Sequence, residues 1–455
     1  MAKRTDEQQY IRMTETPVSR LVTSLALPTV GGMLVSSIYN ITDTFFVSQL
    51  GTSASAAVGV VFSVQSLIQA VGFSIAMGSG SMISRRLGQK DTESANRFVS
   101  TAFAMAFVFG ALLGLFGLLF LEPMMGLLGA TDTMLPHCCN YARYILASAP
   151  IFAASFVLNV AMKSQGNATL SMLGMMAGNV LNMVLDPVLI FACDMGISGA
   201  ALATAVSQCV SFFALLWIFR KKQDTLKLQR KAVSRDVRDY VTIVRVGSPT
   251  LCRQGCGSIA SALLNNQAAL FGDAAVAAMS IANRIYNIIR SVLVGIGQGF
   301  QPVAGYNYGA KRPDRVKAAF RFTVVLGTVI ACLSAAVLAL FAPQLMAIFR
   351  RDDPEVIRMG AVALRMLCVV LPLLAYSTYV NQMLQCLGRS GKATFLASCR
   401  QGTVYVPLIL LLPALWELTG IQLTQPVADG ITFLISIPFH LWFFRSEKGL
   451  KQCEM

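Results

Sequence analysis

Residues 98–121 read FVSTAFAMAFVFGALLGLFGLLFL and contain no Asp, Glu, Lys or Arg. Three further tracts without these charged residues occupy residues 195–219, 254–272 and 322–349. Because a helix of about 20 apolar residues crosses the hydrocarbon core of a bilayer, each tract is long enough to span a membrane. Of the 455 residues, 55% are hydrophobic and 13% are charged, against roughly 25% charged in an average soluble domain. We therefore predict an all-α integral membrane protein.

Charge clusters and Gly, Pro and Asn residues between the apolar tracts divide the chain into twelve predicted transmembrane helices. They begin near residues 20, 54, 97, 140, 168, 197, 240, 275, 321, 360, 393 and 425. The first tract contains Pro28, Asn40 and Asp43 and is too long for a cleaved signal peptide. We interpret it as the first span.

Lys and Arg gather on alternate connections between the spans, whereas the connections near Gly51, Asp194 and Asp273 contain none. The exceptions are Arg350, Arg351 and Arg358. Because Lys and Arg accumulate in cytoplasmic loops, we expect both termini in the cytoplasm and the protein in the cytoplasmic (inner) membrane. The net charge is 37 − 22 = +15. On this topology the positive charge lies at the inner leaflet, where anionic lipid attracts it, so no nucleic-acid partner is expected.

The two halves of the chain match at a nearly constant offset. A shift of 221 residues places Gly51 on Gly272 and Lys90 on Lys311, and a shift of 222 places Gly166 on Gly388. The same shifts pair Pro28 with Pro249, Gly78 with Gly299, Pro150 with Pro372 and Asn159 with Asn381. A constant offset between positionally demanding residues predicts two pseudo-symmetric six-helix lobes.

The repeat and the longest basic stretch divide the chain into five predicted segments. These are a cytoplasmic N-terminal segment (1–19), a first lobe with helices 1–6 (20–220), a basic cytoplasmic linker (221–238), a second lobe with helices 7–12 (239–445) and a cytoplasmic tail (446–455). Two lobes of equal orientation are the plan of an alternating-access transporter. We expect a monomer that binds a small-molecule substrate and membrane lipid.

Two carboxylates, Asp43 and Asp186, fall within predicted spans, where a charge costs about 2.5–3.5 kcal/mol on insertion scales. Helical spacing places Asp43 on one face with Thr29, Ser36 and Asn40, and Asp186 on one face with Asn179 and Asn182. Pro187 follows and removes the partner of the Met183 carbonyl. This set of oxygens predicts a site for a proton or a hard monovalent cation.

A structural interpretation of the same residues is also open: Asp43 caps a helix end, and Asp186 marks a helix boundary. Periodicity alone does not choose between the two. The second half carries Leu264 and Leu411 at or near the positions of Asp43 and Asp186. Folding symmetry would not require that difference, so the repeat favours the cation site.

The second half has polar faces of another kind. They comprise Gln254, Ser258, Ser261 and Asn265 in the seventh span, and Ser280, Arg284, Asn287 and Ser291 in the eighth. Arg253, Arg284 and Arg290 are intramembrane cations that either pair with polar groups or extend toward the interface. With two histidines and no Cys-x-x-Cys pair, no histidine-based metal site or catalytic pair is supported, and no cofactor is expected.

Four stretches closely resemble the multidrug and toxic compound extrusion (MATE) family. They are residues 158–167, 179–191 (NVLNMVLDPVLIF), 196–204 (GISGAALAT) and 297–312 (GQGFQPVAGYNYGAKR). The resemblance implies a twelve-helix, two-lobed antiporter that exports organic compounds in exchange for H⁺ or Na⁺. It also implies a coupling site formed by Asp43, Asn182, Asp186 and Thr204, and Thr204 rests on the resemblance alone.

We therefore expect an exporter of amphipathic, often cationic compounds, not an enzyme. The predicted substrate cavity contains Ser36, Asn40, Asn159, Asn179, Gln254, Ser258, Arg284, Asn287 and Asn381, and the predicted hinges are Pro28, Pro187 and Pro249. One alternative is a flippase for an anionic lipid precursor such as a lipid-linked saccharide, in which the arginines hold a pyrophosphate. A membrane transferase is disfavoured because the adjacent carboxylates, Asp352 and Asp353, fall on the outer side beside arginines.

Overall fold

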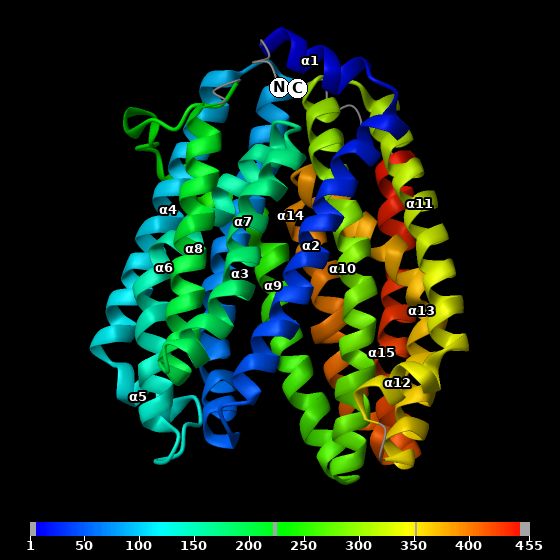
Figure 1. Ribbon diagram of the computed structural model, residues 1–455. Helices are drawn as coiled ribbons and strands as arrows, with labels where there is room; N and C mark the ends of the chain where they lie inside the picture. Colours follow the sequence, from blue (N-terminus) through cyan, green and yellow to red (C-terminus); the bar gives the residue numbers. More distant parts are fainter. Residues whose placement is uncertain (1–5, 222–224, 351–352, 446–455) are drawn as a thin grey trace. The chain divides into compact units, whose positions relative to one another are not determined.

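The computed structural model describes residues 6–221, 225–350 and 353–445, and every regular element in this part of the chain is a helix. The first half contains α1 (Asp6–Glu15), α2 (Val18–Ser48), α3 (Thr52–Gly88), α4 (Thr92–Leu119), α5 (Leu121–Leu127), α6 (Leu135–Ser164), α7 (Ala168–Pro187), the π-helical turn η1 (Val188–Ala192) and α8 (Gly196–Lys221). The linker contributes η2 (Arg230–Ala232). In the first half, α3, α4 and α8 each pack against α6 (Figure 1). The predicted tail, Arg351 and Asp352 lie outside the described residues.

The second half repeats this series. It contains α9 (Val237–Ala269), α10 (Asp273–Gly309), α11 (Pro313–Leu340), α12 (Ala342–Phe349), α13 (Pro354–Cys386), α14 (Ser390–Ser398), the π-helical turn η3 (Cys399–Thr403) and α15 (Tyr405–Arg445). The helix α15 is broken at Trp416 and Glu417, where Glu417 has a φ of 48°. The break separates the eleventh predicted span from the twelfth.

Hydropathy and length alone identify nine stretches in the described residues that could cross a membrane. The last of these, Ser390–Phe444, contains both spans around the break in α15. The helices α9 and α10 complete the predicted twelve, and they carry the polar faces and arginines of the second half. The all-α membrane fold predicted from the sequence is confirmed.

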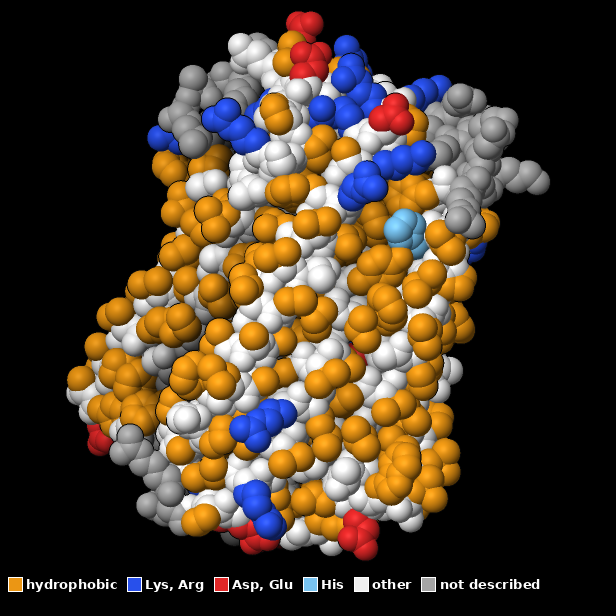
Figure 2. All heavy atoms as spheres, turned by 90° about the vertical axis from the view of Figure 1, so that its right-hand side faces the viewer, with side chains coloured by type: hydrophobic (Ala, Val, Ile, Leu, Met, Phe, Trp, Pro, Cys, Tyr) orange, Lys and Arg blue, Asp and Glu red, His pale blue; other side chains and the backbone are white. Residues whose placement is uncertain are grey.

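Side chains on the outside of these helices are apolar. In α11, Val325, Val329, Leu333 and Val337 recur every four residues and are all exposed. Figure 2 shows a face on which hydrophobic side chains form a broad band, with most of its Lys and Arg side chains gathered near one end. An exposed apolar surface of this extent is typical of contact with lipid tails.

The backbone confirms the internal repeat. The helices α3 and α10 both contain 37 residues, and α4 and α11 both contain 28. Lys90 and Lys311, at equivalent positions, adopt left-handed conformations with φ of 62° and 56°. Residues with a side chain rarely adopt that conformation. Its occurrence at two positions 221 residues apart shows that both halves have the same backbone turn here.

The chain forms two compact units, whose boundaries fall inside α2 and α9. The first comprises Met1–Met13 and Gly31–Gly247, and the second comprises Thr14–Val30 and Ser248–Met455. The helix α2 therefore begins in the second unit and ends in the first, and α9 does the reverse. The lobes predicted from the repeat, residues 20–220 and 239–445, are defined by the sequence offset, whereas the two compact units are defined by contacts. The predicted lobe boundaries therefore stay a prediction.

The first part of α2 packs in the second unit and the first part of α9 packs in the first unit, each against a glycine. In the first unit, a Cβ built on Gly78 would lie 2.1 Å from the backbone oxygen of Ile243 in α9. In the second unit, a Cβ on Gly299 would lie 2.4 Å from Cα of Ala26 in α2. Gly78 and Gly299 occupy equivalent positions, so each unit uses a glycine to admit the first half of a helix that ends in the other.

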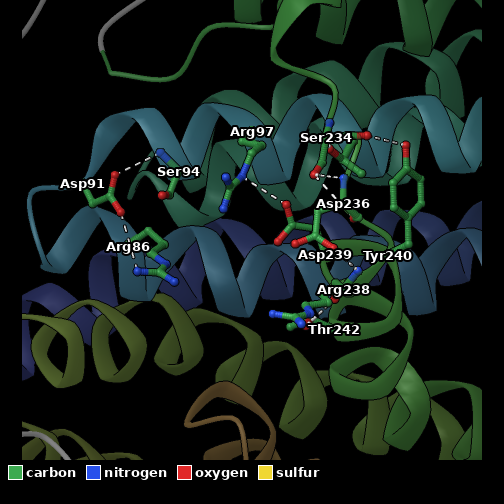
Figure 3. A network of polar contacts seen from close by, with 11 residues as sticks. Arg86, Asp91, Ser94, Arg97, Ser234, Asp236, Arg238, Asp239, Tyr240 and Thr242 are labelled. Carbon is green, nitrogen blue, oxygen red and sulfur yellow. Dashed lines mark hydrogen bonds and ion pairs between the residues drawn. The ribbon is translucent and has the colours of Figure 1, made fainter. Parts of the chain in front are cut away.

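The described part of the linker runs alongside α4 within the first unit. The backbone N–H groups of Lys227, Gln229 and Ser234 donate to Asn96, Ser100 and Thr101 of α4, at 2.6, 3.2 and 2.9 Å. Figure 3 shows the same region, where Arg97 forms an ion pair of 3.0 Å with Asp239 in the first turn of α9. The linker is thus hydrogen-bonded to α4 at three points between Lys227 and Ser234.

Asp91 caps α4 in this region, since its carboxylate accepts a hydrogen bond of 3.0 Å from the Ser94 N–H (Figure 3). Partial burial raises the pKa of this carboxyl, but the bonds from Ser94 and the charges of Arg86 and Arg97 lower it by more, so the pKa lies below its ordinary value. A depressed folded-state pKa means that the stabilisation is present at neutral pH and is lost as the pH falls through that pKa.

We expect Asp91→Ala to lower the free energy of unfolding by about 1 kcal/mol at neutral pH, because the helix loses its cap. The difference from wild type should shrink as the pH falls below the ordinary carboxyl pKa of about 3.9. Thermal unfolding of the purified protein at several pH values measures both effects. Asp132→Ala, at an exposed carboxylate in the α5–α6 connection, is the control; equal losses in the two variants would contradict the capping role.

Candidate functional site

The first unit brings together the two carboxylates that the sequence singles out. Asp43 lies near the end of α2, and Asp186 lies in the last turn of α7, where it is fully buried. Their carboxyl groups are within hydrogen-bonding reach of each other. Two ionised carboxylates cannot donate to one another and repel at this range, so a shared proton or a cation would stabilise the contact.

One oxygen of each carboxylate has no donor. Oδ1 of Asp43 and Oδ1 of Asp186 are buried, and within the described residues neither accepts a hydrogen bond. Buried carboxylate oxygens are costly unless a donor or a positive charge reaches them. The pair therefore fits a proton or a small hard cation, for which oxygen atoms are the preferred ligands.

Asn182 and Thr204 complete the predicted set. The Asn182 amide is satisfied when Nδ2 donates to Oδ2 of Asp186 at 2.9 Å and Oδ1 accepts from the Thr204 backbone N–H at 3.1 Å. The Thr204 hydroxyl lies 3.3 Å from the same end of the amide. Both residues are almost fully buried, so α7 and α8 hold Asp186 in one orientation.

Two tyrosines that were not predicted from the sequence, Tyr39 and Tyr141, also lie beside the carboxylates. Side-chain hydrogen bonds link Tyr39 of α2 to Thr204 and to Gln65 of α3, and Tyr141 of α6 to Thr204. Tyr39 lies one helical turn before Asp43, a spacing that could have revealed it. Tyr141 and Gln65 come from distant helices, and no sequence pattern indicates them.

The interpretation of Asp43 as a helix cap finds no support, whereas Asp186 does lie at a helix boundary, since α7 ends at Pro187. Both residues lie toward the C-terminal ends of their helices, where exposed carbonyls carry partial negative charge and disfavour a carboxylate. In the described residues, no backbone N–H donates to either side chain. The π-helical turn η1 begins directly after Pro187, as expected where a proline interrupts the bonding of α7.

The predicted cavity residues of the first unit separate into two groups. Ser36 and Asn179 meet between α2 and α7, with Nδ2 of Asn179 donating to the Ser36 hydroxyl at 2.8 Å, while Asn40 is exposed on α2. Asn159 is buried and joins α6 to α7 through its bonds with Ser171. Thus Asn159 connects helices, whereas the other three line the face next to Asp43.

The second unit shows the same distinction. Asn381 is buried and donates to the Ala393 carbonyl at 2.6 Å, twelve residues ahead in the chain, as Asn159 donates to Ser171. By contrast, Ser258, Arg284 and Asn287 are exposed, and Gln254 is half-buried. These four side chains are accessible on the faces of α9 and α10.

A third carboxylate lies within the spans, so the prediction of only two, Asp43 and Asp186, is wrong. Asp429 of α15 is fully buried, and its carboxylate accepts bonds of 2.8 Å from Nε of Arg400 and 2.9 Å from the Tyr286 hydroxyl. Nε2 of Gln425 donates to it as well, at 2.9 Å. Asp429 escaped notice because its neighbours in sequence are apolar or small and its partners come from other helices.

The described residues contain no group of three or more His, Cys, Asp or Glu side chains that could hold a metal ion. The candidate cation site in the first unit instead consists of two carboxylates, Asp43 and Asp186, next to the Asn182 amide and the Thr204 hydroxyl. Such a site suits exchange of a monovalent ion more than tight retention of a transition metal.

Comparison with known proteins agrees with this geometry. The MatE family model matches the chain twice, over residues 28–188 and 249–411. The chain belongs to the MATE family. One match falls in each half, which corresponds to the internal repeat. Members of the family couple transport to gradients of H⁺ or Na⁺, and the protein is a multi-pass membrane transporter, not an enzyme.

Proteins similar to this chain match it over nearly its whole length. The multidrug export protein MepA of Staphylococcus saprophyticus is 28% identical over 441 residues, covering 95% of each chain. A multidrug-resistance MATE transporter in an outward-facing conformation matches with a TM-score of 0.91 and 27% identity over 100% of both chains. A transporter from Pyrococcus furiosus, described as having a binding pocket of reverse polarity, matches with a TM-score of 0.89 and 27% identity over 98% of both chains.

Proposed function

We propose that this protein is a multidrug exporter that exchanges amphipathic, often cationic compounds for H⁺ or Na⁺ bound at Asp43 and Asp186. The observation that carries the proposal is the contact between these two carboxylates, each with a buried oxygen that lacks a donor. Multidrug export by the related MepA proteins supports the substrate class. In the proposed topology, a monomer in the cytoplasmic membrane has both termini in the cytoplasm.

The proposed coupling follows from charge. Without a bound ion, the two ionised carboxylates repel each other and favour movement of α2 away from α7. A proton or Na⁺ held between Asp43 and Asp186, with Asn182 and Thr204 orienting Asp186, removes that repulsion and favours the packed arrangement. The ion can shift the equilibrium only by the difference between its affinities for the two states.

Pro28 and Pro249 are the proposed hinges. Each lies within two residues of the point where its helix passes from one compact unit to the other. The first halves of these helices are held by the contacts at Gly299 and Gly78. Because proline weakens the backbone bonding of a helix, bending concentrates at these positions. Pro187 is a third proposed hinge and allows the end of α7 to adjust around Asp186.

Transport into reconstituted vesicles tests the proposal. Vesicles that contain the purified protein receive a fluorescent organic cation with a pH gradient, a Na⁺ gradient or neither. We expect one of the two gradients to drive accumulation of the dye, and collapse of that gradient by a protonophore or a Na⁺ ionophore to reverse it. Accumulation that is the same with and without a gradient would show that the protein is not a cation-coupled exporter.

A further inference from the structure

The second unit contains a cluster of charges in which positive groups outnumber negative ones. The arginine cluster, as we call it, comprises Arg253 of α9, Arg290 of α10, Arg400 of η3 and Asp429 of α15. Arg290 interacts electrostatically with the other three members, and Arg253 interacts with Arg400. Three guanidinium groups and one carboxylate leave a net charge of +2 within a membrane-spanning bundle.

Local packing places these side chains together. Arg290 follows Tyr286 by one helical turn, and the Tyr286 hydroxyl donates to Asp429. Arg253 precedes Gly257 by one turn, and a Cβ built on Gly257 would lie 3.0 Å from Oε1 of Gln401 in η3. The π-helical turn that presents Arg400 therefore packs on α9 one turn from Arg253.

Asp429 neutralises only one of the three arginines. Its carboxylate already accepts from Arg400, Tyr286 and Gln425. In the described part of the chain, Nη2 of Arg400 is buried and has no hydrogen-bond partner. Because the Arg400 side chain is only 9% exposed, water has little access to it. A buried guanidinium nitrogen without an acceptor is costly, and an anion beside it would remove that cost.

Snorkelling does not account for the other two arginines. Arg253 lies midway along α9 (Val237–Ala269), and Arg290 lies midway along α10 (Asp273–Gly309). At these positions neither helix end is within reach of the side chain. Both residues are half-buried, so a solute can reach them, whereas Arg400 and Asp429 are buried.

We propose that the arginine cluster binds an oxyanion, the carboxylate or phosphate group of a small solute or of a lipid headgroup. Guanidinium groups bind these oxyanions through paired, charge-assisted hydrogen bonds. Asp429 holds Arg400 in place, and Arg253 and Arg290 supply the accessible positive charge. The site lies in the second unit, shares no residue with the Asp43–Asp186 pair and is independent of the proposed cation coupling.

Binding of inorganic phosphate to the purified full-length protein tests the proposal. Equilibrium dialysis with radiolabelled phosphate, at constant ionic strength set with sodium chloride, gives the dissociation constant for folded protein isolated by size exclusion. We expect wild type to bind phosphate, and Arg253→Gln and Arg290→Gln, singly and together, to weaken binding about tenfold or more. Arg321→Gln is the matched control, because Arg321 is exposed on α11 of the same unit and lies outside both the cluster and the predicted substrate cavity.

A second arm distinguishes the two sources of the oxyanion. The same variants are compared by native mass spectrometry for retention of phosphatidylglycerol against phosphatidylcholine. Phosphate binding that depends on Arg253 and Arg290 indicates a soluble anion, and dependence confined to phosphatidylglycerol indicates a lipid headgroup; both support the site. If the Arg253 and Arg290 variants match Arg321→Gln in both measurements, the proposal is wrong.

Discussion

Replacing Asp186 by Asn is expected to reduce dye efflux from cells that express the protein to the level of cells that lack it. Asparagine keeps the shape of aspartate and still accepts the bond from Nδ2 of Asn182, so the helix packing survives. It carries no charge, and it can neither release a proton nor attract Na⁺. Asp43→Asn should have the same effect, since both carboxylates are needed to hold the ion.

Efflux of a fluorescent cation, normalised to the amount of protein in the membrane, measures this loss. Asp194→Asn is the matched control, because Asp194 is an exposed carboxylate in the connection between η1 and α8. That variant should retain efflux close to wild type. Wild-type efflux in either Asp43→Asn or Asp186→Asn would remove the proposed coupling site.

The second large effect concerns stability. We expect Asp429→Asn to lower the free energy of unfolding by about 3–5 kcal/mol, because it leaves the charge of Arg400 buried without its counter-ion. Asp429 is fully buried, and the Arg400 side chain is only 9% exposed, so water cannot replace the lost carboxylate. The unfolding temperature of the purified protein, measured with the amount recovered after size exclusion, reports the change.

A double variant separates loss of charge balance from loss of packing. In Asp429→Leu with Arg400→Met, both charges are absent, and the protein should regain more than half of the stability lost in Asp429→Asn. Asp273→Asn, at an exposed carboxylate in the first turn of α10, is the control. An Asp429→Asn protein that unfolds at the wild-type temperature would show that the Arg400–Asp429 pair is not stabilising.

The spans and the repeat could be predicted because their signals are local. An apolar tract such as 98–121 specifies a transmembrane helix by its length, whatever surrounds it. Gly51, Gly272, Gly166 and Gly388 all adopt positive φ, and the matching offsets made them recognisable in the sequence. The pair Asp43 and Asp186 was visible for a related reason, since isolated carboxylates in apolar helices are rare.

Partners across helices could not be predicted in this way. Helical spacing assigns a side chain to a face but does not say which helix packs on that face. Asn159 and Asn381 resembled cavity residues, yet each is buried in a contact with the next helix. Tyr141 reaches Thr204 only through the packing of α6 on α8, which the sequence of α6 does not reveal.

The sequence by itself determined that this chain spans a membrane with two repeated sets of helices and carries acidic groups where lipid would exclude them, because hydrophobicity, charge and glycine position act within a few turns of one helix. The tertiary structure decided which of these groups meet. It joined Asp43 to Asp186 and Arg400 to Asp429, because contact between side chains far apart in the sequence depends on how α2, α7, η3 and α15 pack within their units.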